Sequence, residues 1–512
     1  MKTNRKKNSI KNVIGSMFSN IITIIIGLVA QAIFIKILGS EYLGLNGLFS
    51  NIITMLGIVE LGIGNAIIYN LYKPIAENNI DKIKSLMHFY KKSYLIIAGV
   101  VTIIGLIIIP FLPFFIENVT IDININLVYL LFLADVVCSY LLSYKRSILY
   151  ANQKNYIINF IHIGYTILLN VFQLLILFFT KNYYAYLIIK IIMRIFENLI
   201  ISNIANKKYP YINEKADKLD KETEKDIFTK VKALFFHKIG GFVVLGTDNI
   251  IISKFLGLVT VGLYSNYYLV INAIQTIFGQ IITSFTASIG NMLVTENKEK
   301  CFDIFKKIRF FNFWIATFSA ISFLIIMDSF ISIWLGNDFV LPFIVLSTLV
   351  FNLYQKLMRN TYSSFKEAAG IFYEDRFVPL IESILNIIFS IIFCKLFGLA
   401  GVFMGTIISG FALWCYSYPK YVYKKLFDRS YVDYTKETLG YIILFLFVAG
   451  VTYLLSTSFC ISSIYLKFVF NVLISLIVPN IILLVIFINT DNFKYYLNII
   501  KSVLKNKKSL TK

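Results

Sequence analysis

Ionisable side chains lie inside long apolar stretches of this sequence, where each needs a partner or a function. Lys190, Arg194 and Glu197 follow at i, i+4 and i+7, which places them on one face of a helix. Such a face either forms a cationic wall for an anionic ligand, or Arg194 and Glu197 pair with each other against a neighbouring helix. The spacing leaves both interpretations open.

A second cation, Lys238, follows His237 in FFHKIGGF and has no acid three or four residues away. A cation without a local counter-ion in an apolar segment favours a water-filled cleft. We therefore predict that Lys238 contacts a ligand, the alternative being that its ammonium reaches the membrane surface. His237 is more typical of a packed histidine than of a proton relay.

Acids and amides are the other polar groups within apolar segments. Glu60, Asp135, Asp248 and Glu382 are each suited to bind Na+ or carry a proton, and equally to serve as structural hydrogen-bond acceptors. Neutral amides suit carbohydrate hydroxyls, but they also form contacts between helices in lipid. Those of the second and eighth apolar segments are Asn46, Asn51, Asn65, Asn266, Asn272, Gln275 and Asn291.

Signatures of enzymatic chemistry are absent from the sequence. It contains no G-x-x-x-x-G-K-[ST], H-E-x-x-H or G-x-S-x-G motif, and its five cysteines form no C-x-x-C pair. The three histidines, His88, His162 and His237, are widely separated. We expect no metal site and no catalytic centre.

The elements that position these residues must lie in lipid. Hydrophobic residues make up 58% of the 512 residues, charged residues only 15%, and the mean hydropathy is +0.74. We predict an all-α integral membrane protein with about 14 transmembrane helices. The candidate segments are residues 12–36, 43–69, 93–112, 126–142, 157–179, 184–204, 233–254, 262–294, 310–334, 342–358, 377–395, 402–418, 438–455 and 465–490.

The net charge of +21 is distributed unevenly along the chain. Most of the 49 Lys and Arg residues lie in alternate connections, whereas the intervening connections hold only Lys181. This is the positive-inside pattern, so we expect a multi-pass protein of the cytoplasmic membrane with both termini in the cytoplasm. The charge serves orientation and contact with lipid headgroups, and it does not indicate a nucleic-acid partner.

One sequence pattern occurs twice at the junction between two apolar segments, and it is called the corner below. KILGSEYLGLNG begins at Lys36, and KFLGLVTVGLYS begins at Lys254. The first glycine of each, Gly39 or Gly257, suits a helix stop. The second, Gly44 or Gly262, is predicted to let the returning helix approach its predecessor closely. A third variant, KLFGLAGVFMGT, begins at Lys395 and contains Gly398.

The repeated corner divides the chain into two pseudo-symmetric six-helix lobes, arranged as parallel repeats. An internal twofold of this kind favours a transporter with alternating access over a static scaffold. The predicted parts are a first lobe at 1–205, a cytoplasmic linker at 206–230, a second lobe at 231–430, two further helices at 431–490 and a basic cytoplasmic tail at 491–512.

The block LGSEYLGLNGLFSNIITMLGIVELGIGNAIIYNLYKPIA, from Leu38 to Ala76, resembles the second-helix signature of polysaccharide flippases. These flippases, of the O-antigen or capsule repeat-unit type, belong to the multidrug/oligosaccharidyl-lipid/polysaccharide exporter superfamily. Shorter stretches follow in the family's order: DNIII from Asp248, GLYSNY from Gly262, WLG from Trp334 and GVFMGTIIS from Gly401. The resemblance extends from residue 12 to about residue 425.

The resemblance implies a V-shaped pair of lobes whose first, second, seventh and eighth helices line a central cavity. The implied substrate is an undecaprenyl-diphosphate oligosaccharide, moved to the outer leaflet while its lipid chain stays in the bilayer. Membrane lipids and other membrane proteins of polysaccharide assembly are the further partners expected. No cofactor is implied beyond a coupling Na+ or H+. One departure is that the first helix, from Val13 to Ile35, contains no Arg or Lys.

The roles implied by the resemblance correspond to particular residues of this sequence. Diphosphate or sugar contacts are Lys238, Arg194, Lys36, Asn51, Asn266, Asn272 and Gln275, and coupling-ion candidates are Glu60, Asp248 and Asp135. A drug/cation antiporter of the same fold would need a cavity dominated by acids and aromatics. A membrane polymerase or ligase would need a long outer loop with catalytic residues, but the connection from Pro113 to Ile125 is short and has no Lys, Arg or His.

Overall fold

The computed structural model describes residues 2–60, 63–116, 121–371 and 374–510; of these, the side chains of residues 2–17, 65–66, 230, 232–245, 287, 500 and 503–510 lie outside the description. The described residues are overwhelmingly helical and contain no strand, which confirms the all-α prediction. The helices longer than ten residues are α1 (Lys2–Leu38), α2 (Ser40–Leu56), α3 (Ile63–Ala76), α4 (Ile80–Ile108), α6 (Ile125–Leu141), α8 (Asn155–Thr180), α9 (Tyr183–Lys208), α10 (Lys221–Leu256), α11 (Leu258–Thr283), α13 (Lys298–Trp334), α14 (Phe343–Ala368), α15 (Val378–Phe397), α16 (Leu399–Ala412), α17 (Tyr431–Thr457), α18 (Ile464–Phe487) and α19 (Asp491–Leu510). The shorter α-helices are α5 (Leu112–Phe115), α7 (Tyr144–Ala151) and α12 (Thr286–Thr295), and a π-helix, η5 (Leu413–Leu426), continues α16.

Ten helices among the described residues are long and apolar enough to cross a membrane, and the bent pair of α6 and α7 would make eleven. The remaining three predicted segments, 184–204, 233–254 and 342–358, form the long helices α9, α10 and α14. Helix α9 is less apolar because Lys190, Arg194 and Glu197 lie within it. The side chains of much of α10 lie outside the description.

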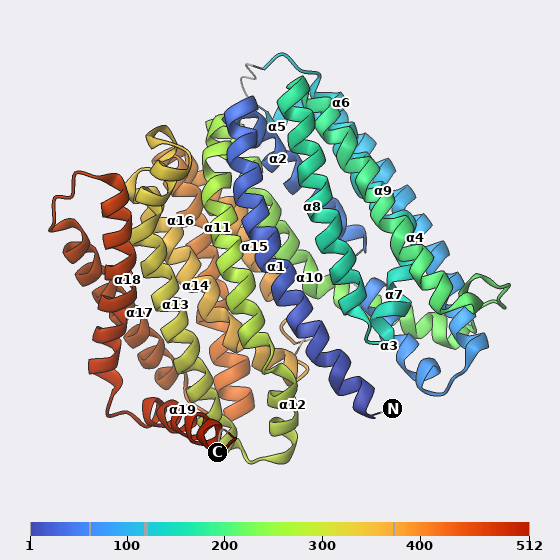
Figure 1. Ribbon diagram of the computed structural model, residues 1–512. Coiled ribbons are helices and arrows are strands. Elements are labelled where there is room, and N and C mark those ends of the chain that lie inside the picture. Colours follow the sequence, from blue (N-terminus) through green and yellow to red (C-terminus); the bar gives the residue numbers. More distant parts are fainter. Residues whose placement is uncertain (1, 61–62, 117–120, 372–373, 511–512) are drawn as a thin grey trace. The chain divides into compact units, whose positions relative to one another are not determined.

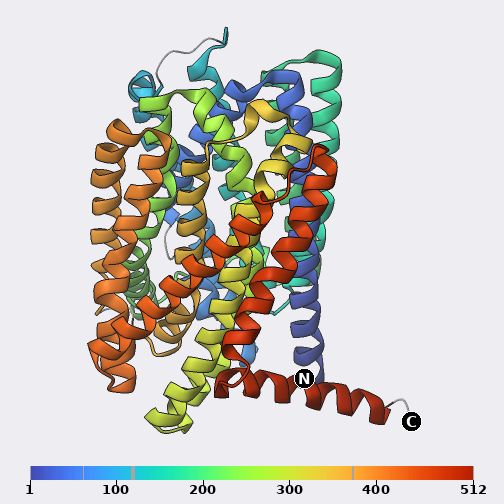
Figure 2. The same cartoon turned by 90° about the vertical axis from the view of Figure 1, so that its left-hand side faces the viewer.

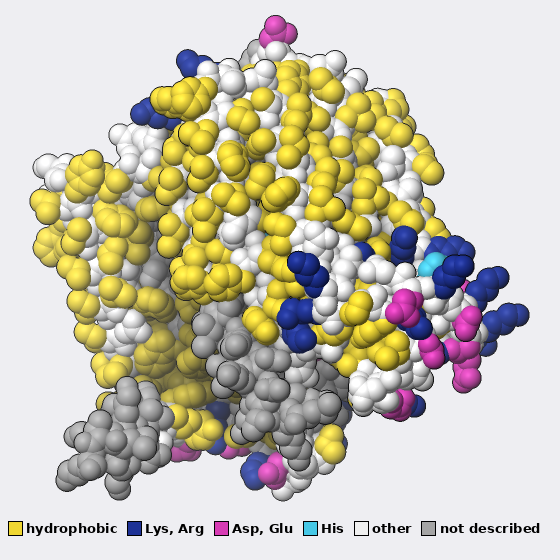
Figure 3. Space-filling model, turned by 45° about the vertical axis from the view of Figure 1, so that its right-hand side comes forward, with side chains coloured by type: hydrophobic (Ala, Val, Ile, Leu, Met, Phe, Trp, Pro, Cys, Tyr) yellow, Lys and Arg dark blue, Asp and Glu magenta, His cyan; other side chains and the backbone are white. Residues whose placement is uncertain are grey.

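The outward faces of α4, α8 and α9 are apolar. Ile103 of α4 is 60% exposed and Phe178 of α8 is 71% exposed. Figure 3 shows a broad hydrophobic surface on the visible face, with charged side chains gathered toward its margin. Because such a surface is unfavourable in water and favourable against lipid tails, it matches a multi-pass membrane protein.

The chain forms two compact units, Met1–Leu269 with Pro379–Ile387, and Val270–Val378 with Ile388–Lys512. In the first unit α1 packs along α8, α9 packs against both α6 and α8, and α10 packs against α2 (Figure 1). In the second unit α13 packs against α14 and α18, and α19 runs crosswise to α18 (Figure 2). The first unit thus includes α10 and the start of α11, and the predicted lobe boundaries at 205 and 231 stay a prediction.

Glycines end helices where the repeated corner predicts them. Gly39 separates α1 from α2 with φ 94°, and Gly257 separates α10 from α11 with φ 83°. Gly398, between α15 and α16, has φ 59°. These positive φ angles disfavour any residue with a side chain, so the predicted helix stops are confirmed.

The prediction for the second glycine of each corner was wrong about the neighbour. Gly44 lies against the backbone of Leu258, and Gly262 lies against the backbone of Ser40. Each glycine therefore approaches the other corner rather than the helix that precedes it. A glycine permits close approach to any backbone, and the sequence does not name which one.

Candidate substrate and coupling sites

The i, i+4, i+7 face of α9 lies against α6. Lys190 Nζ is 3.1 Å from Asp135 Oδ2 of α6, and Arg194 Nε donates to Asp135 Oδ1 at 3.4 Å. Arg194 Nη1 also donates to Glu197 Oε2 at 3.1 Å. The structure therefore brings together four of the polar residues that the sequence singled out, and it bears out the alternative in which Arg194 pairs with Glu197.

Glu197 gathers two more partners that sequence reasoning missed. Arg146 Nη2 of α7 lies 3.1 Å from Glu197 Oε2, and His162 Nδ1 of α8 lies 3.0 Å from Glu197 Oε1. Arg146 also donates to Asn198 at 2.8 Å. Asp135, Arg146, His162, Lys190, Arg194 and Glu197 together are called the α9 cluster below.

Charge within the α9 cluster does not balance. Arg146, Lys190 and Arg194 are three cations, whereas Asp135 and Glu197 are two carboxylates. The Glu197 side chain is fully buried, but those of the three cations remain 22 to 28% exposed. Desolvating the carboxylates is costly and is offset by their several partners. Within these six residues the cations outnumber the carboxylates by one, and this excess can attract an anion.

Aromatic rings support two of the cluster cations. The Arg194 guanidinium lies 4.9 Å from the Tyr165 ring centroid, and Lys190 Nζ lies 5.0 Å from the Phe132 ring centroid. Tyr165 in turn stacks on His162 at 5.6 Å. Cation–π contacts of this kind strengthen when water is excluded, so the rings help to hold the cations in place.

The other two predicted cations are placed differently. Lys36 is exposed near the end of α1, as expected for a lysine that reaches a membrane surface. Lys238 belongs to α10, but its side chain lies outside the described residues. Lys36 is not part of the α9 cluster, and the contacts of the Lys238 side chain lie outside the description.

The predicted amides occupy contrasting environments. Asn266 of α11 is fully buried, accepts a hydrogen bond from Gln31 Nε2 at 2.5 Å and donates to the Gly262 carbonyl at 3.1 Å. Its amide thus links helices, which is the alternative left open by the sequence. Asn51 is half-buried on α2; Asn272 is exposed and Gln275 half-buried further along α11.

The coupling-ion candidates are also held by neighbours. Glu60 accepts a hydrogen bond from Tyr94 Oη at 3.0 Å. Asp248 is buried on α10 beside Thr247, which donates to Asn386 Oδ1 of α15 at 3.0 Å. Asp135 lies in the α9 cluster. Among the described residues no group of three or more His, Cys, Asp or Glu side chains is arranged to hold a metal ion.

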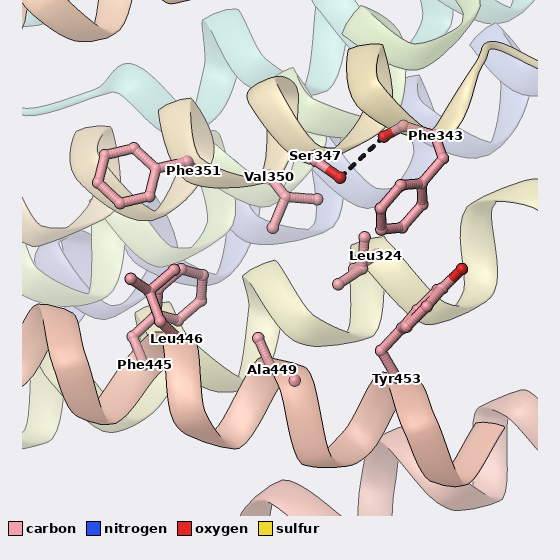
Figure 4. Close-up of a pocket in the computed structure, with 10 residues that line it drawn as sticks. Leu324, Phe343, Ser347, Val350, Phe351, Phe445, Leu446, Ala449 and Tyr453 are labelled. Atoms are coloured by element: carbon pink, nitrogen blue, oxygen red, sulfur yellow. Dashed lines mark hydrogen bonds between the residues drawn. The ribbon is translucent and has the colours of Figure 1, made fainter. Parts of the chain in front are cut away.

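A cavity of about 230 Å³ in the second unit is almost entirely apolar. Figure 4 shows Phe343, Phe351, Phe445 and Tyr453 around it, with Ser347 Oγ bonded to the Phe343 carbonyl at 2.8 Å. Because its lining contains no charged side chain and is mostly aliphatic and aromatic, this cavity offers little to a charged head group. Its lining suits a hydrocarbon chain.

The structure resembles solved transporters. The lipid II flippase MurJ in an inward closed conformation has a TM-score of 0.66 and 16% identity, covering 92% of this chain and 98% of that chain. An inward-facing multidrug resistance MATE family transporter of the MOP superfamily has a TM-score of 0.61 and 14% identity, covering 76% of this chain and 91% of that chain. A MATE transporter of Vibrio cholerae, VcmN, has a TM-score of 0.57 and 14% identity, covering 83% and 99%.

At these identities the resemblance shows the fold alone, which this chain shares with these transporters. No curated protein matched the sequence. A family model described as polysaccharide biosynthesis protein matches residues 9–286. Because that match covers more than half of the 512 residues, this chain belongs to the polysaccharide biosynthesis protein family.

Proposed function

We propose that this chain flips an undecaprenyl-diphosphate-linked oligosaccharide across the cytoplasmic membrane by alternating access. Membership of a polysaccharide biosynthesis family and a fold shared with a lipid II flippase support this function. The substrate head carries a diphosphate with about two negative charges, which cannot cross hydrocarbon without replacing part of its hydration. Its lipid chain stays in the bilayer.

The observation that carries the proposal is the positive excess of the α9 cluster. Lys190 and Arg194 are partly exposed, so their spare hydrogen-bonding capacity is accessible to an incoming phosphate oxygen. Asp135 and Glu197 hold the cations in position. Lys238, Lys36 and the amides Asn51, Asn272 and Gln275 remain proposed contacts along the path.

A drug/cation antiporter is the second candidate, because two of the similar solved structures are MATE transporters. An organic cation would be repelled by a cluster in which cations outnumber carboxylates. This observation favours the anionic glycolipid. For coupling we propose Glu60 or Asp248; Asp135 suits Na+ less well, because Lys190 and Arg194 already occupy its carboxylate.

Proteoliposomes test the function directly. The purified protein should move a fluorescent undecaprenyl-diphosphate oligosaccharide between leaflets, measured by its accessibility to a membrane-impermeant quencher. Lys190→Gln, which removes the excess charge but keeps the Arg194–Glu197 pair, should slow flipping about tenfold, equivalent to about 1.4 kcal/mol. The control Lys181→Gln, at an exposed position beyond α8, should flip normally. Transport of a cationic drug without flipping would establish the antiporter instead.

A further inference from the structure

Helix α19 follows directly after a membrane span of the second unit. Helix α18 is among the candidate spans and ends at Phe487, and α19 begins at Asp491 after only residues 488–490. Figure 2 shows α19 running crosswise to α18. A helix that follows a span so closely and lies across its axis runs along the membrane surface. Its 20 residues give it a length of about 30 Å there.

Aromatic side chains hold the first part of α19 against α13. The Phe493 ring stacks on the Trp314 ring with 6.0 Å between centroids, and the Tyr496 ring stacks on Phe311 at 5.5 Å. Tyr496 Oη also donates to the Lys307 carbonyl at 3.2 Å. Because Phe493 and Tyr496 are three positions apart, these contacts use one side of the helix.

Lysines gather on another side of α19. Lys494 and Lys501 are both exposed and stand seven residues apart, which places them on one face of a helix. In the sequence, Lys505 and Lys508 continue the same helical spacing at i+11 and i+14 from Lys494. The helix contains one acid, Asp491, against five lysines, so its charge is strongly positive.

The side of α19 across from these lysines is apolar. Tyr495, Tyr496 and Ile499 line a cavity of about 220 Å³ that α12 and α13 complete, and most of its other lining side chains are apolar too. The charged group in this lining is Lys307, which is already held in an ion pair and lies 4.4 Å from the Tyr495 ring centroid. At about 3.6 residues per turn, Tyr496 and Ile499 lie across the helix from Lys494. The cavity therefore suits hydrocarbon.

We propose that α19 is a docking surface for anionic phospholipids of the membrane. A helix with an apolar side and a lysine-rich side binds at the interface through burial of the first and electrostatic attraction of the second. Here the lysine face attracts the phosphate groups, and acyl chains of the same leaflet fill the cavity beside Ile499. An anionic lipid is favoured over a zwitterionic one, because the positive charge is not balanced within α19. This inference is independent of the substrate that the chain moves.

The fluorescence of Trp314 tests which lipid lies at α19, because its ring stacks on Phe493. Trp334→Phe and Trp414→Phe leave Trp314 as the only tryptophan of the full-length protein. In phosphatidylcholine nanodiscs, phosphatidylglycerol brominated on its acyl chains should quench this fluorescence at about a tenfold lower mole fraction than brominated phosphatidylcholine does. Equal quenching by the two lipids would overturn the proposal, as expected if the lysines served an acidic protein instead.

Lysine variants test whether the preference belongs to α19. Lys494→Gln, Lys501→Gln, Lys505→Gln and Lys508→Gln combined should make the two lipids quench equally, whereas changing the same four residues to arginine should retain the preference. Lys436→Gln is the matched control, because Lys436 is an exposed lysine near the start of α17 in the same unit. High salt should weaken the preference of the unsubstituted protein. A preference that survives the four glutamine substitutions would refute the role of α19.

Discussion

Glu197 is the residue on which the α9 cluster depends, because its buried carboxylate receives Arg146, Arg194 and His162. Glu197→Gln keeps the shape of the side chain but leaves two guanidinium groups without their shared counter-ion. We predict a loss of about 3–5 kcal/mol in the free energy of unfolding, as for other broken buried ion pairs. Denaturant unfolding of the detergent-purified protein measures it.

The matched control for that loss is Glu214→Gln. Glu214 is exposed and lies 3.3 Å from Lys84, so removing its charge should cost under about 1 kcal/mol. Equal destabilisation by the two substitutions would mean that the cluster has no special role in stability.

Lys238 is the residue whose role depends on its sequence context alone. Because no acid stands three or four positions away, Lys238→Ala should abolish flipping while the protein stays in the membrane. Lys238→Arg, which keeps the charge, should retain most of the activity. Quantitative flipping in proteoliposomes with matched protein content distinguishes these outcomes, and normal flipping by Lys238→Ala would refute the assignment.

Sequence spacing alone predicted that three of the six residues of the α9 cluster lie together. The i, i+4, i+7 pattern predicted that Lys190, Arg194 and Glu197 share a face, since helix geometry alone sets that relation. In the sequence, Arg146 is one of several basic residues in a connection between apolar segments, and His162 is an isolated histidine. Their contact with Glu197 depends on how α7 and α8 pack against α9, which spacing within one segment does not determine.

At the scale of elements, Asp220 connects the start of α10 to α4 through an ion pair. Its carboxylate accepts from the Thr223 N–H at 2.9 Å and pairs with Lys82. The Lys82 ammonium, followed by the Thr223 hydrogen bonds, holds the pKa of Asp220 well below its ordinary value. A folded-state pKa below the unfolded one stabilises the fold above pH about 3.9, and this contribution is lost as the pH falls through the folded pKa.

We therefore predict a pH-dependent effect of Asp220→Asn, which keeps the helix cap but removes the ion pair. At pH 7 the variant should exchange the backbone amides of residues 209–220 faster than the unsubstituted protein. The difference should shrink as the pH falls below about 4, where the opened state takes up a proton that the native ion pair excludes, and it should vanish only below the pKa of the native carboxylate. Hydrogen exchange with mass spectrometry measures both. A difference that is independent of pH would show that the ion pair contributes nothing.

The linker illustrates what composition does and does not determine. Residues 206–230 carry mixed charge, which is typical of a solvated segment. A short 3-10 helix occurs there at Pro210–Asn213, and the residues from Lys221 belong to α10. Yet Tyr209 and Ile212 are buried, and Glu214 and Asp220 pair with lysines of α4. Two buried apolar side chains are enough to hold this polar segment against the neighbouring helix. Their burial depends on that helix rather than on the average polarity of the segment.

At the scale of the whole molecule, topology depends on whether α9 crosses the membrane. Its 26 residues span about 39 Å, longer than the ~30 Å hydrocarbon core. Its charges oppose insertion, but Asp135, Arg146 and His162 supply partners for them from neighbouring helices. We predict that α9 does cross, so that the N-terminus and the linker face the same, cytoplasmic side.

Variants with a single cysteine at an exposed position test whether α9 crosses the membrane. They are made in a background without the five native cysteines. With a membrane-impermeant maleimide on intact cells, Asp122→Cys, before α6, should be labelled, whereas Asp217→Cys in the linker should react only after permeabilisation. Labelling of both, with an N-terminal tag still protected, would mean that α9 does not cross. Labelling at Asp217→Cys and at the tag, but not at Asp122→Cys, would invert the topology. Because each arrangement leaves a different set of sites exposed, the three positions together decide among them.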